Sequence, residues 1–281
     1  MSTELHNEIQ PLLAVHNLSL HTTRFGHTKV IISDMSFNIS MGASVGLVGE
    51  SGSGKTLSAL AVLDILPGEI QKVNGSIYFQ GKLVSAHRLP TFASLRGKNI
   101  AMIFQNAATA LNPVFQVGRQ IKDIIRCHFS IGQREAKERT LELLHNVGLP
   151  ESHNIYRRYP HELSGGMVQR VMIAMALSCQ PKLIIADEPT TALDVKTQLQ
   201  IIRLIKSFQQ KYNFGLLLIT HDIQLISDMV EDVLVLHQGK IVEKGLLRDL
   251  QHNPKHYYTR HLFSAGLQWS KINRYSFLVE E

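Results

Sequence analysis

Short apolar segments rich in β-branched residues recur along the chain, with turn residues between them. Such runs are typical of strands in a parallel sheet that is buried on both faces. The strands predicted in this way are Leu12–Val15, Val45–Val48, Ile100–Phe104, Leu183–Ala186, Leu216–Thr220 and Val233–Leu236. Helical periodicity between several of them predicts helices over Leu57–Leu66, Arg134–Val147, Met167–Leu177 and Thr197–Tyr212. This alternation of strands and helices indicates an α/β fold.

Two regions depart from the alternation. Ala14–Leu20, Ser33–Ser40 and Ser76–Phe79 carry short alternating patterns without helices between them, which favours an antiparallel edge sheet in the N-terminal part. Residues from about 106 to 177 contain no convincing strand and indicate a helical insertion. Because no repeat or long linker separates independent units, we expect a single cassette.

Composition narrows the class of protein only slightly. The 281 residues are 44% hydrophobic and 19% charged, as in ordinary folded proteins. The longest apolar stretch, Val171–Cys179, is far shorter than the roughly 18 residues of a membrane-spanning helix, and the polar N-terminus lacks the features of a secretory signal. We therefore expect a protein that stays inside the cell, with Cys127 and Cys179 reduced and without a role. The net charge of +6 suits nucleic acid and an anionic membrane equally.

A glycine-rich segment between a predicted strand and a predicted helix has the pattern of a phosphate-binding loop. The segment reads Gly49, Glu50, Ser51, Gly52, Ser53, Gly54, Lys55, Thr56. Glycines let the backbone wrap around phosphate oxygens, and the amides at the start of the helix point at them. Lys55 should reach the β- and γ-phosphates, and Thr56 should bind Mg²⁺. The segment predicts a nucleotide site.

Two adjacent carboxylates end the apolar strand over Leu183–Ala186. A buried strand carries Asp187 and Glu188 at its end only where a partner compensates their charge, and a magnesium nucleotide is such a partner. Asp187 is then placed for the metal, directly or through water, and Glu188 can accept a proton from the attacking water. The alternative is a solvated strand end.

A second glycine-containing segment opens the helix predicted over Met167–Leu177. Ser164 offers a hydroxyl, and Gly165 and Gly166 offer flexible backbone amides. These groups form an anion site by the same physical logic as the first loop. Ser164 could equally be a plain helix N-cap, and the residues alone do not decide between the two readings.

Six motifs in this order resemble the ABC ATPase cassette across nearly the whole chain. They are the phosphate loop at 49–56, Gln105 after Phe104, the signature LSGGM at 163–167, the pair Asp187 and Glu188, the loop from Thr191 to Asp194, and His221 with Asp222. The resemblance implies an α/β fold: a P-loop ABC ATPase cassette with a RecA-like core, an N-terminal antiparallel β subdomain and an inserted helical signature subdomain. It also implies an ATPase domain over 1–252, with the helical subdomain at about 106–177, and a short importer-type tail over 253–281.

The resemblance also assigns roles. It implies a head-to-tail dimer in which Ser164, Gly165, Gly166 and Met167 act in trans on the ATP held by the other cassette, with Asp194 in a dimer-contact loop. Many cassettes carry Gln in place of Met167. Gln105 and His221 join Glu188 as catalytic residues, and Thr56, Gln105 and Asp187 are the residues expected at Mg²⁺. Phe25 looks like the aromatic residue that stacks on adenine, with core packing as the alternative.

Several stretches narrow the resemblance to the dipeptide, oligopeptide and nickel importer ATPases. They are 110–115, 159–167, 169–176 and 253–260. The resemblance implies a heterodimer with a second ABC ATPase subunit, two transmembrane permeases, an extracytoplasmic substrate-binding protein and a place on the cytoplasmic face of the inner membrane. The stretch Ile65–Gly68 and the short tail look closer to the nickel branch, although Tyr257 replaces a proline usual in the tail.

ABC ATPases of DNA repair and chromosome maintenance are the alternative of a different class. They usually carry long coiled-coil or zinc-bearing insertions between the phosphate loop and the signature. This chain has neither sustained heptads nor cysteine pairs there, so no nucleic-acid partner is expected. A regulatory cassette that binds ATP without hydrolysis would lack groups that this chain has, namely Glu188 and His221.

Overall fold

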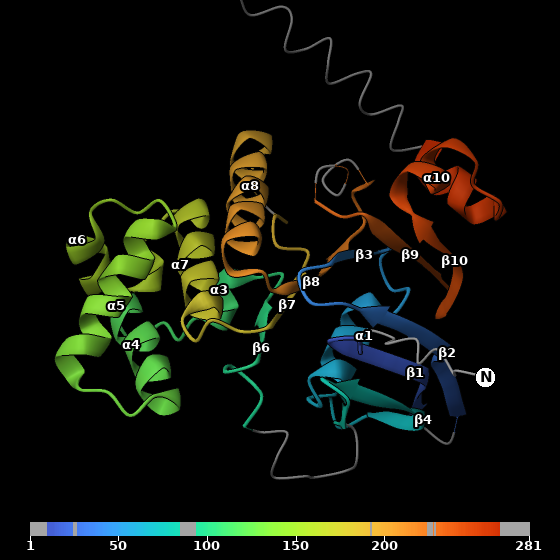
Figure 1. Cartoon of the computed structure of the whole chain (residues 1–281), viewed down its shortest axis with the longest axis horizontal. Helices are drawn as coiled ribbons and strands as arrows, with labels where there is room; N and C mark the ends of the chain where they lie inside the picture. The colour runs from blue at the N-terminus through green and yellow to red at the C-terminus, as the bar shows by residue number, and fades with distance from the viewer. Residues whose placement is uncertain are drawn as a thin grey trace, which may run out of the picture.

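The computed structural model describes residues 10–24, 27–84, 94–191, 193–223, 227 and 229–264. These residues form two sheets with helices packed between and beside them (Figure 1). Predictions that involve Phe25 or Ala192 lie outside the described residues.

The N-terminal part forms the antiparallel sheet that the sequence predicts. Its strands, in the spatial order β2-β1-β4-β5, are β1 (Leu13–Arg24), β2 (His27–Ile39), β4 (Ile70–Phe79) and β5 (Lys82–Leu83). Strand β4 is longer than the predicted Ser76–Phe79 because Gly75, at φ +96, carries it past a register shift against β1. A Cβ at Gly75 would lie 2.6 Å from the backbone of Leu18, so glycine is required at this close approach.

The central sheet is parallel except for one edge strand. Its described strands lie in the order β10-β9-β3-β8-β7-β6: β3 (Ser44–Val48), β6 (Ile100–Ile103), β7 (Leu183–Asp187), β8 (Gly215–Thr220), β9 (Asp232–His237) and β10 (Lys240–Leu246), with β10 antiparallel to β9. Every residue of β7 and β8 is buried. This explains why the strands read as continuous apolar runs.

Alternate residues of β7 pack into two hydrophobic cores, one on each face of the central sheet. Leu183 and Ile185 pack with the antiparallel sheet and helix α1 (Lys55–Val62), whereas Ile184 and Ala186 pack with α7 (Gly165–Leu177) and α8 (Val195–Tyr212). Helix α1 ends earlier than the predicted Leu57–Leu66, because Asp64 adopts a left-handed conformation at φ +53. The parallel sheet is therefore covered on both faces, and the carboxyl ends of its strands meet at one edge.

Residues 106–177 contain helices and no strand, as the sequence predicts. They are α3 (Ala107–Ala110), α4 (Val117–His128), α5 (Gln133–Asn146), α6 (Ser152–Arg157), the short 3₁₀ helix η1 (Pro160–Glu162) and α7. This group lies to one side of the sheets in Figure 1. Arg170 joins it to the core, donating to the Val147 carbonyl at 2.7 Å and to the Gln200 amide oxygen at 3.0 Å.

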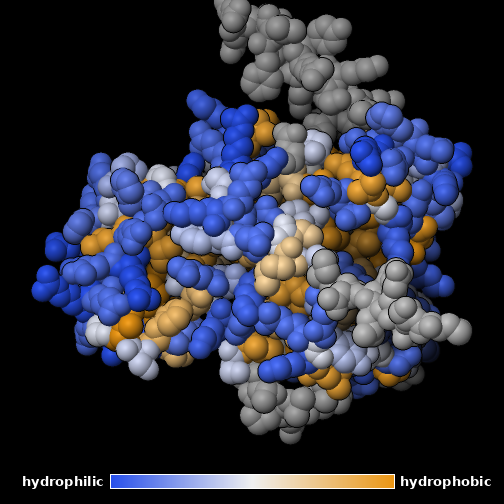
Figure 2. Space-filling view, in the orientation of Figure 1, coloured by the Kyte–Doolittle hydropathy of each residue, from blue (hydrophilic) through white to orange (hydrophobic). Residues whose placement is uncertain are grey.

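The last described part of the chain returns to the edge of the central sheet. Helix α10 (Leu247–His252) follows β10, and helical residues 257–264 complete the described chain. The face drawn in Figure 2 is mostly hydrophilic, with apolar side chains in smaller groups between the elements. Among the described residues, no helix is both long and apolar enough to span a membrane.

Candidate functional site

The loop between β3 and α1 is built from glycines that no other residue replaces without strain or displacement. Gly52 and Gly54 have φ of +79 and +107, and Gly54 begins helix α1. A Cβ at Gly49 would lie 2.2 Å from the Leu236 carbonyl oxygen, so the loop packs directly against the end of β9. The loop therefore keeps its backbone amides close to the start of a helix, which is the arrangement that binds phosphate.

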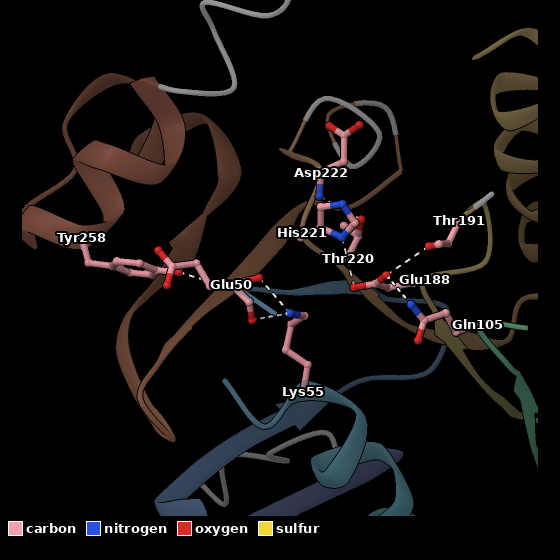
Figure 3. A network of polar contacts seen from close by, with 10 residues as sticks. Glu50, Lys55, Gln105, Glu188, Thr191, Thr220, His221, Asp222 and Tyr258 are labelled. Carbon is pink, nitrogen blue, oxygen red and sulfur yellow. Dashed lines mark hydrogen bonds and ion pairs between the residues drawn. The ribbon is translucent and has the colours of Figure 1, made fainter. Parts of the chain in front are cut away.

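Lys55 is buried and folds back over the loop (Figure 3). Its ammonium group donates to the carbonyl oxygens of Gly49 and Glu50, each at 2.8 Å. Burial lowers its pKa, while the carboxylates of Glu188, Asp187 and Glu50 oppose that change. A phosphate bound at the loop would stabilise the positive charge of this buried ammonium group.

Asp187 lies at the carboxyl end of β7 and is 2% exposed. Burial raises its pKa, and a hydrogen bond from the Thr56 side chain opposes that rise. Its Oδ1 atom has no hydrogen-bonding partner among the described residues. A buried carboxylate oxygen without a partner, next to a hydroxyl group, fits the oxygen ligands that Mg²⁺ prefers.

Glu188 is the centre of a hydrogen-bonded group drawn from three strand ends (Figure 3). Its Oε2 atom accepts from Gln105 Nε2 at 2.9 Å and from Thr191 Oγ1 at 3.0 Å. Its Oε1 atom lies 3.0 Å from His221 Nδ1. Glu188 has φ +43, a conformation that few non-glycine residues adopt, and its amide donates to the Ile219 carbonyl. The three residues predicted to be catalytic thus meet at one carboxylate.

A cavity of about 470 Å³ joins the phosphate loop to this carboxylate. Its walls include Ser51, Gly52, Gly54, Lys55, Thr56, Gln105 and Glu188. They also include residues that the sequence did not indicate: Lys29, Val30, Ile31, Gln238 and Gly239. Strand β2 and the turn between β9 and β10 bring these residues to the cavity, with Ser33 donating to the Gly239 carbonyl. The cavity offers phosphate-binding amides at one side and a proton-accepting carboxylate at the other.

The signature residues do not join this cavity. Ser164 caps helix α7, and its hydroxyl oxygen accepts from the Met167 amide at 3.4 Å. None of Ser164, Gly165, Gly166 and Met167 lines the 470 Å³ cavity. The N-cap prediction therefore describes the local structure of Ser164.

Asp194 caps helix α8 mainly through Thr197. Its carboxylate accepts from the Thr197 amide at 2.9 Å and from the Thr197 hydroxyl at 2.7 Å. These bonds, the hydroxyl first, lower its pKa. Thr191 was predicted to lie in the same loop, without a role of its own. Its hydroxyl donates to Glu188 and so helps to hold that carboxylate.

Comparison with known proteins shows which proteins the chain is similar to. The profile described as "ABC transporter" matches residues 32–191, more than half of the chain. The chain is 45% identical over 257 residues to the peptidoglycan transport ATP-binding protein YejF of Agrobacterium fabrum, covering 91% of this chain and 47% of that protein. It is 42% identical to the oligopeptide transport ATP-binding protein AppD of Bacillus subtilis, over 90% of this chain and 78% of that one.

Two further similarities agree with these. The probable D,D-dipeptide transport ATP-binding protein DdpD of Escherichia coli is 43% identical, over 89% of this chain and 76% of its own length. A dimeric ATP-binding cassette, solved in a post-hydrolysis state with ADP and Pi, superimposes with a TM-score of 0.75 at 26% identity, covering 84% of this chain and 99% of that one. The chain thus spans about half the length of YejF and about three quarters of AppD and DdpD.

Proposed function

Because the chain belongs to the ABC transporter family of ATP-binding proteins, we propose that it is the ATP-hydrolysing subunit of an importer whose cargo is a peptide. The observation that carries the enzymatic part is the single cavity in which Lys55 and the Glu188 hydrogen-bonded group face each other. A protein that only bound nucleotide would not need a carboxylate held by three side chains in the cavity that the phosphate loop lines. We assign residues 1–252 to the ATPase domain, with a helical subdomain at about 106–177, and residues 253–281 to an importer-type tail.

The chemistry follows from the positions of the side chains. Amides of the 49–56 loop, other than the Glu50 amide that is bonded to Tyr258, bind the phosphates of ATP, and Lys55 moves its ammonium group from the Glu50 carbonyl to the β- and γ-phosphates. Glu188 accepts the proton of the attacking water, and Gln105, Thr191 and His221 hold its carboxylate in one orientation.

Magnesium fits the same site. Thr56, Asp187 and Gln105 would hold it, since Asp187 Oδ1 is buried without a partner and Thr56 contacts the same carboxylate. When bound, the ion would neutralise charge on the phosphate oxygens. Phe25, proposed to stack on adenine, lies outside the described residues.

The position of the signature segment supports a second ATPase subunit as a partner. Ser164 and the two glycines are accessible at the start of α7 and lie away from the cavity of their own chain. We propose that they complete the ATP site of a second, different ATPase subunit, with Asp194 in the contact between the two. Two permeases and an extracytoplasmic binding protein complete the importer, which places this chain at the cytoplasmic face of the inner membrane.

The names of the relatives support a peptide cargo. Peptidoglycan, oligopeptide and D,D-dipeptide transport are the activities given for YejF, AppD and DdpD. All three are transport proteins, which supports transport over DNA repair. The preference for nickel that Ile65–Gly68 suggests stays a prediction, since none of these three names refers to a metal.

The test is uptake by a deletion strain. Loss of the gene should abolish uptake of labelled dipeptides or oligopeptides, and the wild-type gene should restore it, whereas a gene encoding Lys55→Ala should not. Undiminished peptide uptake together with lost nickel uptake would replace the proposed cargo with nickel. Unchanged uptake of both, with sensitivity to DNA damage, would overturn the transport function.

A further inference from the structure

A tyrosine near the end of the described chain contacts the phosphate loop. The Tyr258 hydroxyl oxygen accepts a hydrogen bond from the Glu50 amide at 2.9 Å, across 208 positions of sequence (Figure 3). Tyr258 is 3% exposed, and burial raises its pKa, so its hydroxyl stays neutral. The tail therefore supplies a fixed acceptor to the second residue of the loop.

Contacts of Tyr258 itself, and of Lys255 and His256 just before it, hold its side chain in place. Its ring stacks on His237, at the end of β9, with 3.9 Å between ring centroids. The two carboxylate oxygens of Glu243, on β10, accept from the amides of Lys255 and His256 at 2.8 and 3.0 Å. These bonds satisfy amides at the start of helical residues 257–264, as an N-cap does. Tyr258 is thus anchored to β9, against which the loop packs, and to the neighbouring β10.

The peptide groups of Glu50 are held from several sides. The amide donates to Tyr258, while the carbonyl accepts from Lys55 Nζ at 2.8 Å and from the Ser53 amide at 3.2 Å. A bound phosphate would replace the Glu50 carbonyl as the acceptor for Lys55 Nζ. The Tyr258 bond involves no group that contacts phosphate, so it can persist while ATP binds.

We propose that Tyr258 is a positioning residue for ATP: its hydroxyl keeps the phosphate loop in the conformation that binds nucleotide. This inference rests on the proposed function. Without the hydroxyl, the partly buried Glu50 amide lacks its acceptor, so conformations in which water solvates that amide gain population. The apparent affinity for ATP then falls in proportion to the fraction of molecules whose loop stays in the binding conformation. Once ATP is bound, the phosphates themselves order the loop, and the chemical step proceeds as before.

The experiment uses the full chain and Tyr258→Phe, which removes one oxygen atom from a buried ring. We expect the Kd for ATP with Mg²⁺ to rise about five- to tenfold, and KM to rise with it, while kcat at saturating ATP stays within about twofold of wild type. The matched control is Tyr257→Phe, because Tyr257 is 67% exposed and its ring and hydroxyl contacts, within the described part of the chain, are to the imidazoles of His237 and His256. The control should bind ATP as the wild type does.

A purely structural role would lower the thermal midpoint and leave Kd unchanged well below that temperature. Wild-type Kd in Tyr258→Phe therefore overturns the inference, as does an equal loss in Tyr257→Phe. If Tyr258→Phe does not fold, Glu243→Gln carries the test: it loosens the start of the helical segment and should raise Kd in the same direction. Failure of the wild-type chain to bind ATP would instead overturn the proposed function.

Discussion

Replacing Glu188 with glutamine should separate binding from hydrolysis, and the contacts of the wild-type carboxylate fix how the amide would lie. Gln105 and Thr191 both donate to Oε2, so the amide oxygen of Glu188→Gln must take that position. Its NH₂ group then faces His221 Nδ1, which must accept, so the imidazole carries its proton on Nε2. All three contacts survive, and the free energy of unfolding should change by less than about 1 kcal/mol.

The catalytic loss follows from the missing base. A positioned general base contributes about 10²- to 10⁴-fold to a rate, which corresponds to about 3–5 kcal/mol in the activation free energy. Nucleotide binding should be retained or strengthened, because the substitution removes a negative charge that faces the cavity and leaves an N–H donor on His221. Unhydrolysed ATP should then hold this cassette closed against its partner.

The assay compares steady-state hydrolysis and ATP-dependent association of the two cassettes, in a complex whose other site is inactive. Glu142→Gln, the same chemical change at an exposed position of α5, is the control and should hydrolyse ATP at the wild-type rate. Normal hydrolysis by Glu188→Gln would show that another group accepts the proton. Loss of ATP binding in Glu188→Gln would show that the carboxylate has a role in binding that the geometry does not indicate.

Three further predictions concern the same site. Lys55→Ala should abolish measurable ATP binding or hydrolysis, because its ammonium group lies over the loop, bonded to the carbonyl oxygens of Gly49 and Glu50, and is placed to reach the phosphates; wild-type affinity together with wild-type hydrolysis would contradict this. Gly49→Ala should weaken ATP binding by about tenfold or more, since its Cβ would meet the Leu236 carbonyl oxygen at 2.2 Å. In Gly52→Ala the new Cβ has open space, so the only cost is the strain of the left-handed backbone, roughly 1–2 kcal/mol. Gly52→Ala should therefore weaken ATP binding less than Gly49→Ala, and equal losses of ATP affinity in a binding titration would refute the distinction. Asp187→Asn should raise the free energy of unfolding of the nucleotide-free protein at neutral pH, because burial raises the pKa of the native carboxyl and its ionisation opposes folding. The difference in free energy of unfolding between Asp187→Asn and the wild type should widen as the pH rises through that raised pKa. Denaturant melts in which this difference shrinks would contradict the reasoning.

The sequence predicted the parts of the site that are local in the chain. The phosphate loop and the carboxylates after β7 each follow a buried strand, so a short pattern identifies them. The parallel alignment of those strands then brings Lys55, Gln105, Glu188 and His221 together without further information. The helical character of residues 106–177 was likewise predictable, although the individual bounds of α4 and α6 were not.

Contacts between distant segments could not be predicted in this way. Gln238 and Gly239 enter the cavity wall through the pairing of a turn with β2, and nothing in their own sequence indicates phosphate. Tyr258 reads as an ordinary core aromatic until its hydroxyl is seen beside the Glu50 amide. Strand β6 ends one residue before the predicted Phe104, and α8 begins two residues before the predicted Thr197, because caps and turns set such boundaries.

The position of β6 at the end of the central sheet has an evolutionary consequence. Glu188 and His221 follow strands that are hydrogen-bonded on both sides, whereas Gln105 follows a strand whose ladder in the described residues joins only β7. Displacing an outermost strand breaks fewer hydrogen bonds than displacing an interior one. Gln105 therefore follows a strand that is easier to displace than the strands that precede Glu188 and His221. Substitutions around β6 can therefore change the position of Gln105 during evolution while Glu188 and His221 keep theirs.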